Sequence, residues 1–434
     1  MKQGFILSET GYRNVPESDK TVRLVFLICF FLTAGILSSQ NSSSNTDNRS
    51  VEALIKSMVD MHHSVLSAEE QVEAARMGLE QQYMFFLPFS ANIGTNTYGS
   101  LTAPDFNISA SFDISYTIFD WKTIQEVKRL KILEEVSVEY EKSVRQIVMY
   151  KLCNMIITWI SSMKNYNLAF QDYDSIKSYT EKMQQRFDMG DISKTELDFA
   201  NGRLLKADGL VVQSEYAIRE AEHLFKAETG ETFSDGMKDI QFSVNTFLAT
   251  ESDKLIAIQN RPDIKQSVLL ISALQQEKNS VYSNTIPVIR LTTSLKYPFD
   301  NPNAWQAGLN FTIPLSSIKY DKLRDQQYSV SLKSKEHDLA LFIENSMANL
   351  LVSEEKIRNL KKVLEINRKA LKYAEQAVEG VLIEFKAGVR TSFDVIDAQN
   401  TFSTMSYQVV SNEIELLKAE LNYQYALGGL NFEQ

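Results

Sequence analysis

The sequence predicts a mostly α-helical chain with membrane β-strands and an internal duplication. Three observations support this fold class. The segment that begins at Gly190 matches the segment that begins at Gly388 in register, so the chain repeats itself at an offset of 198 residues. No proline stands between Pro104 and Pro262 or after Pro314, which permits very long helices. Four runs alternate polar and apolar residues, which is the period of a β-strand.

The N-terminus resembles an export signal. Residues 24–37 form an apolar run behind two basic residues and ahead of two serines. This order is typical of a secretory signal peptide, and the run is short for a membrane-spanning helix. We predict a signal peptide at 1–39, with an uncleaved anchor as the alternative, and a flexible mature N-terminus at 40–50.

Each half supplies one β-hairpin. In residues 106–118 every even position is apolar and every odd position is polar, over a length that suits a tilted membrane-crossing strand. The same alternation recurs, most weakly in the first case, at 89–98, 289–297 and 305–313. We predict hairpins at 87–119 and 287–315. One such run alone would fit half of a soluble sandwich, but four favour a membrane barrel, and because four strands cannot close one, several chains must share it.

Each hairpin leads into a long helix, and each long helix leads into a return helix. We predict long helices at 120–187 and 316–385, each about 100 Å long at 1.5 Å per residue. The return helices, predicted at 193–230 and 391–428, keep apolar residues at three-and-four spacing, which predicts coiled-coil packing and burial of those residues.

These elements define two structural repeats. The first spans 51–230 and the second 258–434, and each opens with a helix ahead of its hairpin. A segment of mixed structure is predicted between them at 231–257. Within each repeat Gly190 or Gly388 suits the left-handed position that ends a helix. Two pairs then have the spacing of a capping box: Ser193 with Glu196, and Thr391 with Asp394.

Composition and motifs argue against several function classes. The net charge is −10, which disfavours nucleic acid as a partner. No nucleophile stands with a base and no phosphate-binding loop is found, so we predict neither enzymatic activity nor a cofactor. His62 and His63 are adjacent and would point about 100° apart on a helix, so we predict a surface pair and no metal site. Cys153 is predicted to be buried.

Taken together, these features resemble the TolC-like outer-membrane efflux proteins, or outer membrane factors. The resemblance extends from about Val51 to Leu430. Beyond the duplicated turns it rests on Arg261-Pro262-Asp263-Ile264, Thr229-Gly230, Leu427-Gly428, Pro88 and Pro287. It implies a homotrimer in which twelve strands, four per chain, form one outer-membrane barrel. That barrel would continue into a long α-helical barrel, and most of the mass would lie in the periplasm of a Gram-negative cell.

The resemblance also implies a gate. The segment from Gly388 to Ala398 is similar to the periplasmic tip of the family. This similarity implies an acidic entrance ring of Asp394 and Asp397, and a latch of Arg390 with Thr195 and Glu196. Capping by Asp394, a solvated helix face at Asp397 and a surface charge at Arg390 remain alternatives. Phe385 departs from the family pattern, which has a hydrogen-bonding tyrosine at this place.

The function that follows is a passive exit duct of a tripartite efflux system. An inner-membrane transporter would supply energy, and a periplasmic adaptor would dock at the turns, around Gly190, Ser193, Gly388 and Thr391. Outer-membrane lipid would surround the strands. Two alternatives are the outlet of a type I protein secretion system and, from a different class, a periplasmic coiled-coil scaffold.

Overall fold

The computed structural model describes residues 51–84, 90–100, 103–233, 250–297, 305–313 and 318–429. The predicted signal peptide and the predicted flexible N-terminus lie outside these ranges, as do residues 234–249 of the predicted mixed segment.

The two halves have the same order of elements. The first contains α2 (Val51–Met61), α3 (His63–Met84), β1 (Ser90–Ser100), β2 (Ala103–Phe119), α4 (Trp121–Asp188) and α5 (Lys194–Thr229). The second contains α6 (Glu251–Asn260), α7 (Pro262–Ser280), the 3₁₀ turn η2 (Val281–Thr285), β3 (Val288–Tyr297), β4 (Trp305–Thr312), α8 (Ile318–Lys386) and α9 (Ser392–Leu427). The predicted fold class is confirmed, since the chain is mainly helical with four antiparallel strands.

The long helices α4 and α8 have 68 and 69 residues. Asp120 caps α4, because its carboxylate accepts hydrogen bonds from the Lys122 backbone N–H (3.0 Å) and the Thr123 hydroxyl (2.8 Å). None of the helices in the described ranges is both long enough and apolar enough to span a bilayer. The apolar stripes of the return helices lie in the core, as predicted, at Leu197, Ala200, Ala207, Ala221 and Phe225 in α5 and at Val395, Val409, Ala419, Tyr423 and Ala426 in α9.

The strands form one sheet in the order β1-β2-β3-β4. Its register places rows of like residues across all four strands. One row is apolar and exposed, and consists of Ile93, Phe112, Leu295 and Trp305. The adjacent row is polar, and consists of Asn92, Asp113, Ser294 and Gln306. Because neighbouring rows point to opposite faces, the sheet has one apolar face and one polar face.

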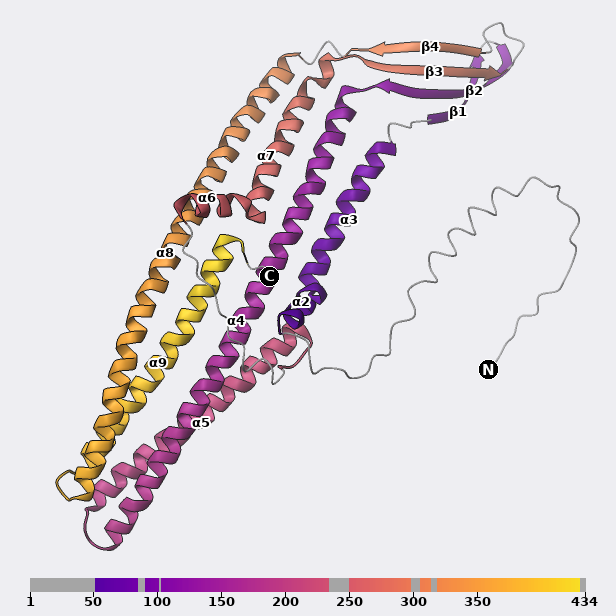
Figure 1. The fold of residues 1–434 in the computed structure, drawn as a ribbon. Helices are drawn as coiled ribbons and strands as arrows, with labels where there is room; N and C mark the ends of the chain where they lie inside the picture. Colours follow the sequence, from indigo (N-terminus) through magenta and orange to yellow (C-terminus); the bar gives the residue numbers. More distant parts are fainter. Residues whose placement is uncertain are drawn as a thin grey trace, which may run out of the picture. The chain divides into compact units, whose positions relative to one another are not determined.

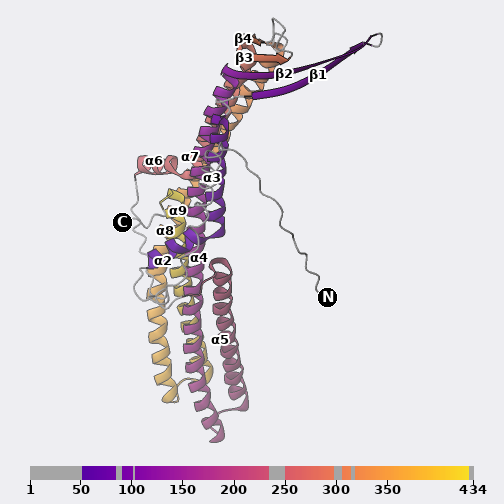
Figure 2. The same cartoon turned by 90° about the vertical axis from the view of Figure 1, so that its right-hand side faces the viewer.

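The helices lie four across in two tiers (Figures 1 and 2). Next to the sheet the order is α3, α4, α7, α8, and towards the helix turns it is α5, α4, α9, α8. Between the tiers α2 packs on α4 and α6 packs on α8. Two apolar clusters form the core there, one around Leu152, Ile156 and Phe225, the other around Ile258, Leu350 and Tyr423. The helix α8 therefore forms one edge of both tiers.

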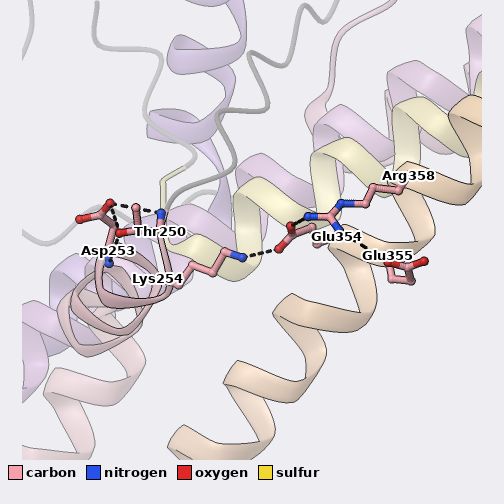
Figure 3. Close-up of polar contacts among 6 residues, drawn as sticks. All are labelled: Thr250, Asp253, Lys254, Glu354, Glu355 and Arg358. Carbon is pink, nitrogen blue, oxygen red and sulfur yellow. Dashed lines mark hydrogen bonds and ion pairs between the residues drawn. The ribbon is translucent and has the colours of Figure 1, made fainter.

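An ion pair fixes the short helix α6 to α8 (Figure 3). The Lys254 ammonium contacts the Glu354 carboxylate, and both side chains are buried. Glu354 also pairs with Arg358 on the next turn of α8, while Thr250 and Asp253 form the capping box that begins α6. The helical end of the predicted mixed segment is thus held by charge as well as by its apolar contacts.

One expectation about single side chains was wrong and one is confirmed. His62 is not a surface residue, because it lies in the break between α2 and α3 and its ring turns towards the end of α5. Its Nε2 is 2.8 Å from a carboxylate oxygen of Glu228, and only 9% of its side chain is exposed. Cys153 is fully buried, and burial raises the pKa of its thiol to about 12.

Candidate functional site

The first candidate element is the turn that joins α4 to α5. Gly190 has a φ of +79°, which a residue with a Cβ adopts only at a cost, and its N–H donates to the Phe187 carbonyl (2.9 Å). The helix α5 then begins with a capping box. The Glu196 N–H donates to the Ser193 hydroxyl (3.3 Å), and the Ser193 N–H donates to the Glu196 carboxylate (3.0 Å).

The turn between α8 and α9 repeats this construction 198 residues later. Gly388 has a φ of +77° and its N–H donates to the Phe385 carbonyl (3.1 Å). The Asp394 N–H donates to the Thr391 hydroxyl (3.4 Å), and the Thr391 N–H donates to the Asp394 carboxylate (2.8 Å). The two turns are therefore equivalent in backbone and differ in the side chains they expose.

The turns are joined to each other above their tips. The Ser392 hydroxyl on α9 donates to the Glu196 carboxylate on α5 (3.1 Å), and the Tyr179 hydroxyl on α4 donates to the Ser392 carbonyl (3.2 Å). Glu196 thus caps its own helix with one oxygen and accepts from the other turn with the second. A small apolar cluster packs beside these contacts and consists of Met183, Leu197, Ala200 and Ile396.

Arg390 is placed differently from the expected latch. Its Nε donates to the Glu384 carboxylate (2.8 Å), in the last turn of α8, and both side chains are about half exposed. In this chain the polar contact between the two turns comes from Ser392 and Glu196, and Thr195 is exposed. The reason is local, because the reversal at Gly388 folds Arg390 back alongside the helix that it follows.

The two predicted ring acids lie three residues apart at the start of α9. Asp397 is exposed, whereas Asp394 is partly enclosed by the cap. Hydrogen bonds from the backbone and hydroxyl of Thr391 hold the pKa of Asp394 below its ordinary value, and Arg390 adds to the effect. Asp394 is therefore a capping residue and an ionised carboxylate at the same time.

Phe385 replaces a hydroxyl contact with contacts of its ring. The Arg186 guanidinium of α4 lies 4.8 Å from the centre of the Phe385 ring, and the Tyr179 ring lies 5.9 Å away. A cation held over an aromatic face contributes about 0.5–1 kcal/mol at an exposed site. The contact between α4 and α8 is thus kept in a form that the sequence comparison did not predict.

A buried carboxylate above the turns was missed by sequence reasoning. Asp172 of α4 is 6% exposed, and it accepts hydrogen bonds from Arg203 on α5 (3.3 Å) and from the Ser403 hydroxyl on α9. A signal was present in the sequence. Asp172 interrupts an apolar run at three-and-four spacing between Ala169 and Ile176, and an acid in such a position needs a partner.

A cavity of about 520 Å³ opens beside Arg203, the partner of this carboxylate, between α4 on one side and α8 and α9 on the other. Its lining includes Tyr179, Arg203, Phe385, Ile396 and Phe402. The contact between the two helix pairs is therefore interrupted by a cavity where the turns approach.

Comparison with known proteins supplies a family context. Residues 256–429 match a family model described as outer membrane efflux protein. The outer membrane protein TolC of Salmonella enteritidis is 20% identical over 399 residues, which cover 84% of this chain and 77% of that protein.

Solved structures share the fold at low identity. A membrane protein from Pseudomonas aeruginosa superposes with a TM-score of 0.76 at 14% identity, covering 90% of this chain and 95% of that one. The open state of the MtrE outer membrane channel of Neisseria gonorrhoeae gives a TM-score of 0.73 at 15% identity, covering 91% and 95%. The likeness includes both halves of the chain and therefore extends beyond the range of the family model.

Proposed function

This chain belongs to the TolC-like outer membrane efflux proteins, and we propose that it is the outer-membrane exit duct of a tripartite efflux system. One observation carries the proposal. The sheet and each of the two helical tiers are four elements wide and end in edges suited to pairing with further copies of the chain.

The sheet supports the membrane part of the proposal. Its apolar row is exposed in the single chain, with 80% of Ile93 and 69% of Trp305 accessible. An apolar outer face and a polar inner face are what a membrane barrel with an aqueous lumen requires. The strand order leaves β1 and β4 as edges, and their antiparallel directions allow β4 of one copy to pair with β1 of the next.

The helices support the same closure. The helix α5, at one edge of the lower tier, exposes Leu205, Val212 and Tyr216 at coiled-coil spacing. At the other edge α8 exposes Ile366, Tyr373 and Ile383. Since the two edges are different surfaces, packing one against the other is a head-to-tail contact, which closes into a ring when the rotation between successive copies completes a full turn.

We propose that the ring is a homotrimer. Four strands per chain need at least two chains for the roughly eight strands that enclose an interior, and the family resemblance implies three chains and twelve strands. The duct would be passive, driven by an inner-membrane transporter. A periplasmic adaptor would dock on the turns at Gly190, Ser193, Gly388 and Thr391, where Met189 and Val389 are exposed.

Asp394 and Asp397 are the proposed entrance ring. Three copies would place six carboxylates around one axis, which attracts cations and repels anions. Arg390, bound to Glu384 in the single chain, is proposed to exchange this partner for Thr195 and Glu196 of the other turn when the entrance closes.

Single-channel recording in a planar bilayer tests the proposal. The wild type is expected to conduct with cation preference. Asp394→Asn combined with Asp397→Asn should abolish that preference, because asparagine keeps an oxygen for the cap at position 394 but removes both charges. The matched control is Asp191→Asn with Asp198→Asn, which removes two exposed charges from the other turn and should leave selectivity unchanged.

Two results would contradict the proposal. Absence of conductance from a membrane-inserted oligomer would contradict the proposed channel. Equal selectivity in both double variants would contradict the proposed entrance ring. Fractionation on a sucrose gradient addresses the scaffold alternative, because the duct must migrate with the outer membrane and an N-terminally anchored scaffold with the inner membrane.

A further inference from the structure

The lower tier consists of two helix pairs that meet along a partly polar contact. The pair α4/α5 and the pair α8/α9 are each held by apolar stripes. We define the seam as the contact of α4 residues 172–179 with α9 residues 392–403. Its polar contacts include Tyr179 with Ser392 and Asp172 with Ser403. Because the cavity of about 520 Å³ adjoins the seam, the pairs can shift against each other without compressing a close-packed core.

Asp172 connects the two pairs through one carboxylate. Its Oδ2 accepts from Arg203, which lies on α5 in the same pair, and its Oδ1 accepts from Ser403, which lies on α9 in the other pair. The Asp172 side chain is 5% exposed and the Arg203 side chain is 11% exposed. A carboxylate in this position cannot be left without a donor, so its partners restrict where α9 can lie.

The network around Asp172 is incompletely paired. Among the described residues, Nε of Arg203 and the hydroxyl of Tyr407 are buried and have no hydrogen-bond partner. Burial and the negative charge of Asp172 raise the pKa of Tyr407, which places this phenol in the field of the same carboxylate. A contact built only for stability would pair these groups, because each unpaired one is costly.

Ser403 and Tyr407 are one turn apart on α9. Residues four apart lie on the same face of a helix, so both hydroxyls are directed towards the same side of the seam. One is bonded to Asp172 and the other is not. A shift of α9 along α4 by up to one turn, about 5.4 Å, would exchange them.

We propose that Asp172 is a two-position latch of the seam, bonded to Ser403 in the described packing and to Tyr407 in a second packing of α9 on α4. This inference rests on the proposed function, since the second packing is assigned to the conducting state of the tip. This Asp172 latch differs from the proposed entrance ring and from the proposed Arg390 latch, because its residues are buried within one chain and need no contact between copies.

The latch predicts opposite effects from two hydroxyl removals. Ser403→Ala weakens the described packing and should raise the open fraction in single-channel recordings roughly fivefold, the change in population that loss of one hydrogen bond produces. Tyr407→Phe weakens the second packing and should lower the open fraction by a similar factor. Ser406→Ala is the matched control, because Ser406 is as buried as Ser403 (8% exposed) but its hydroxyl bonds to Phe402 of its own helix.

A second readout separates the latch from the channel. Amide hydrogen exchange of residues 392–410 in the purified full-length protein should rise in Ser403→Ala and stay at the wild-type rate in Ser406→Ala. If the wild type conducts and Ser403→Ala matches Ser406→Ala in both measurements, the latch is wrong and the channel stands. Suppose that no variant conducts while the amide hydrogen exchange responds as expected. The switch of Asp172 between Ser403 and Tyr407 then stands, and the channel function is wrong. If Tyr407→Phe raises the open fraction as Ser403→Ala does, the two-position latch is overturned.

Discussion

The two halves of the chain contain the same joint, made with different chemistry. In the first half the break between α2 and α3 meets the end of α5, where the His62 ring contacts the Glu228 carboxylate. In the second half the break between α6 and α7 meets the end of α9, where the Arg261 guanidinium donates to the Ala426 carbonyl (2.9 Å). Glu228 and Ala426 are 198 residues apart, the offset of the repeat.

The partners beside each joint differ in the same sense. His62 accepts a hydrogen bond from the Ser64 N–H at the start of α3, and Glu228 is shared with Lys151. Arg261 instead forms two hydrogen bonds with Asp263. The duplicated halves have therefore kept the backbone arrangement but use different groups. The first joint pairs the His62 imidazole with the Glu228 carboxylate, whereas the second pairs the permanently charged Arg261 guanidinium with a backbone carbonyl.

The largest expected difference between the joints is in their glycines. Gly230 and Gly428 end α5 and α9 with φ of +74° and +76°, so alanine costs about 1–2 kcal/mol at either. At position 428 a Cβ would also lie 2.7 Å from Cγ of Arg261, whereas the space at 230 is open. Gly428→Ala should therefore lower the midpoint of thermal unfolding distinctly more than Gly230→Ala, measured by circular dichroism in detergent. Equal decreases would mean that Arg261 moves aside freely.

A smaller difference is expected between the basic residues. Arg261→Ala removes a mostly buried guanidinium with bonds to Asp263 and to a backbone carbonyl, and should destabilise the protein by about 2–3 kcal/mol. His62→Ala removes a cap and one partly exposed pair, at about 1 kcal/mol. Thermal unfolding of both variants at neutral pH checks the order. The reverse order would show that the first joint contributes more to the stability of the protein than the second.

The smallest expected effect is the pH dependence of the first joint. Hydrogen bonds from Lys151 and then from His62 hold the pKa of Glu228 below its ordinary value. The stability that this carboxylate adds is therefore present above about pH 4.3 and is lost as the pH falls through the lowered value. Glu228→Gln should lose less stability on acidification below pH 5 than the wild type, by a fraction of a kcal/mol. Parallel pH profiles of the unfolding midpoint would contradict this.

Features set by neighbouring residues could be predicted from the sequence. The glycine conformations at 190 and 388 follow from the absence of a Cβ, and the capping pairs follow from a spacing of three residues. The strands were recognisable because an alternating pattern repeats over many residues. Because the chain is duplicated, each of these features occurs in both halves of the sequence, and the two halves gave the same prediction.

Contacts between distant side chains could not be predicted in this way. In the single chain Arg390 is bonded to Glu384, a partner that the reversal of its own chain supplies and that the sequence did not indicate. His62 was expected at the surface, because the helix break that turns its ring inward has no strong signal in the sequence. Asp172 finds Arg203 on α5 and Ser403 on α9, and only the packing of three helices brings those residues together.

The position of the strands within the repeats also has a kinetic consequence. Each hairpin connects residues that are close in sequence, so β1 can pair with β2, and β3 with β4, soon after synthesis. The central pairing of β2 with β3 joins residues 110–119 to residues 289–297, across the helices α4, α5, α6 and α7. Loop closure over such a distance is entropically costly and slow. We expect the two preformed hairpins to pair through β2 and β3 last, after the helices between these strands have folded and brought the strands close together.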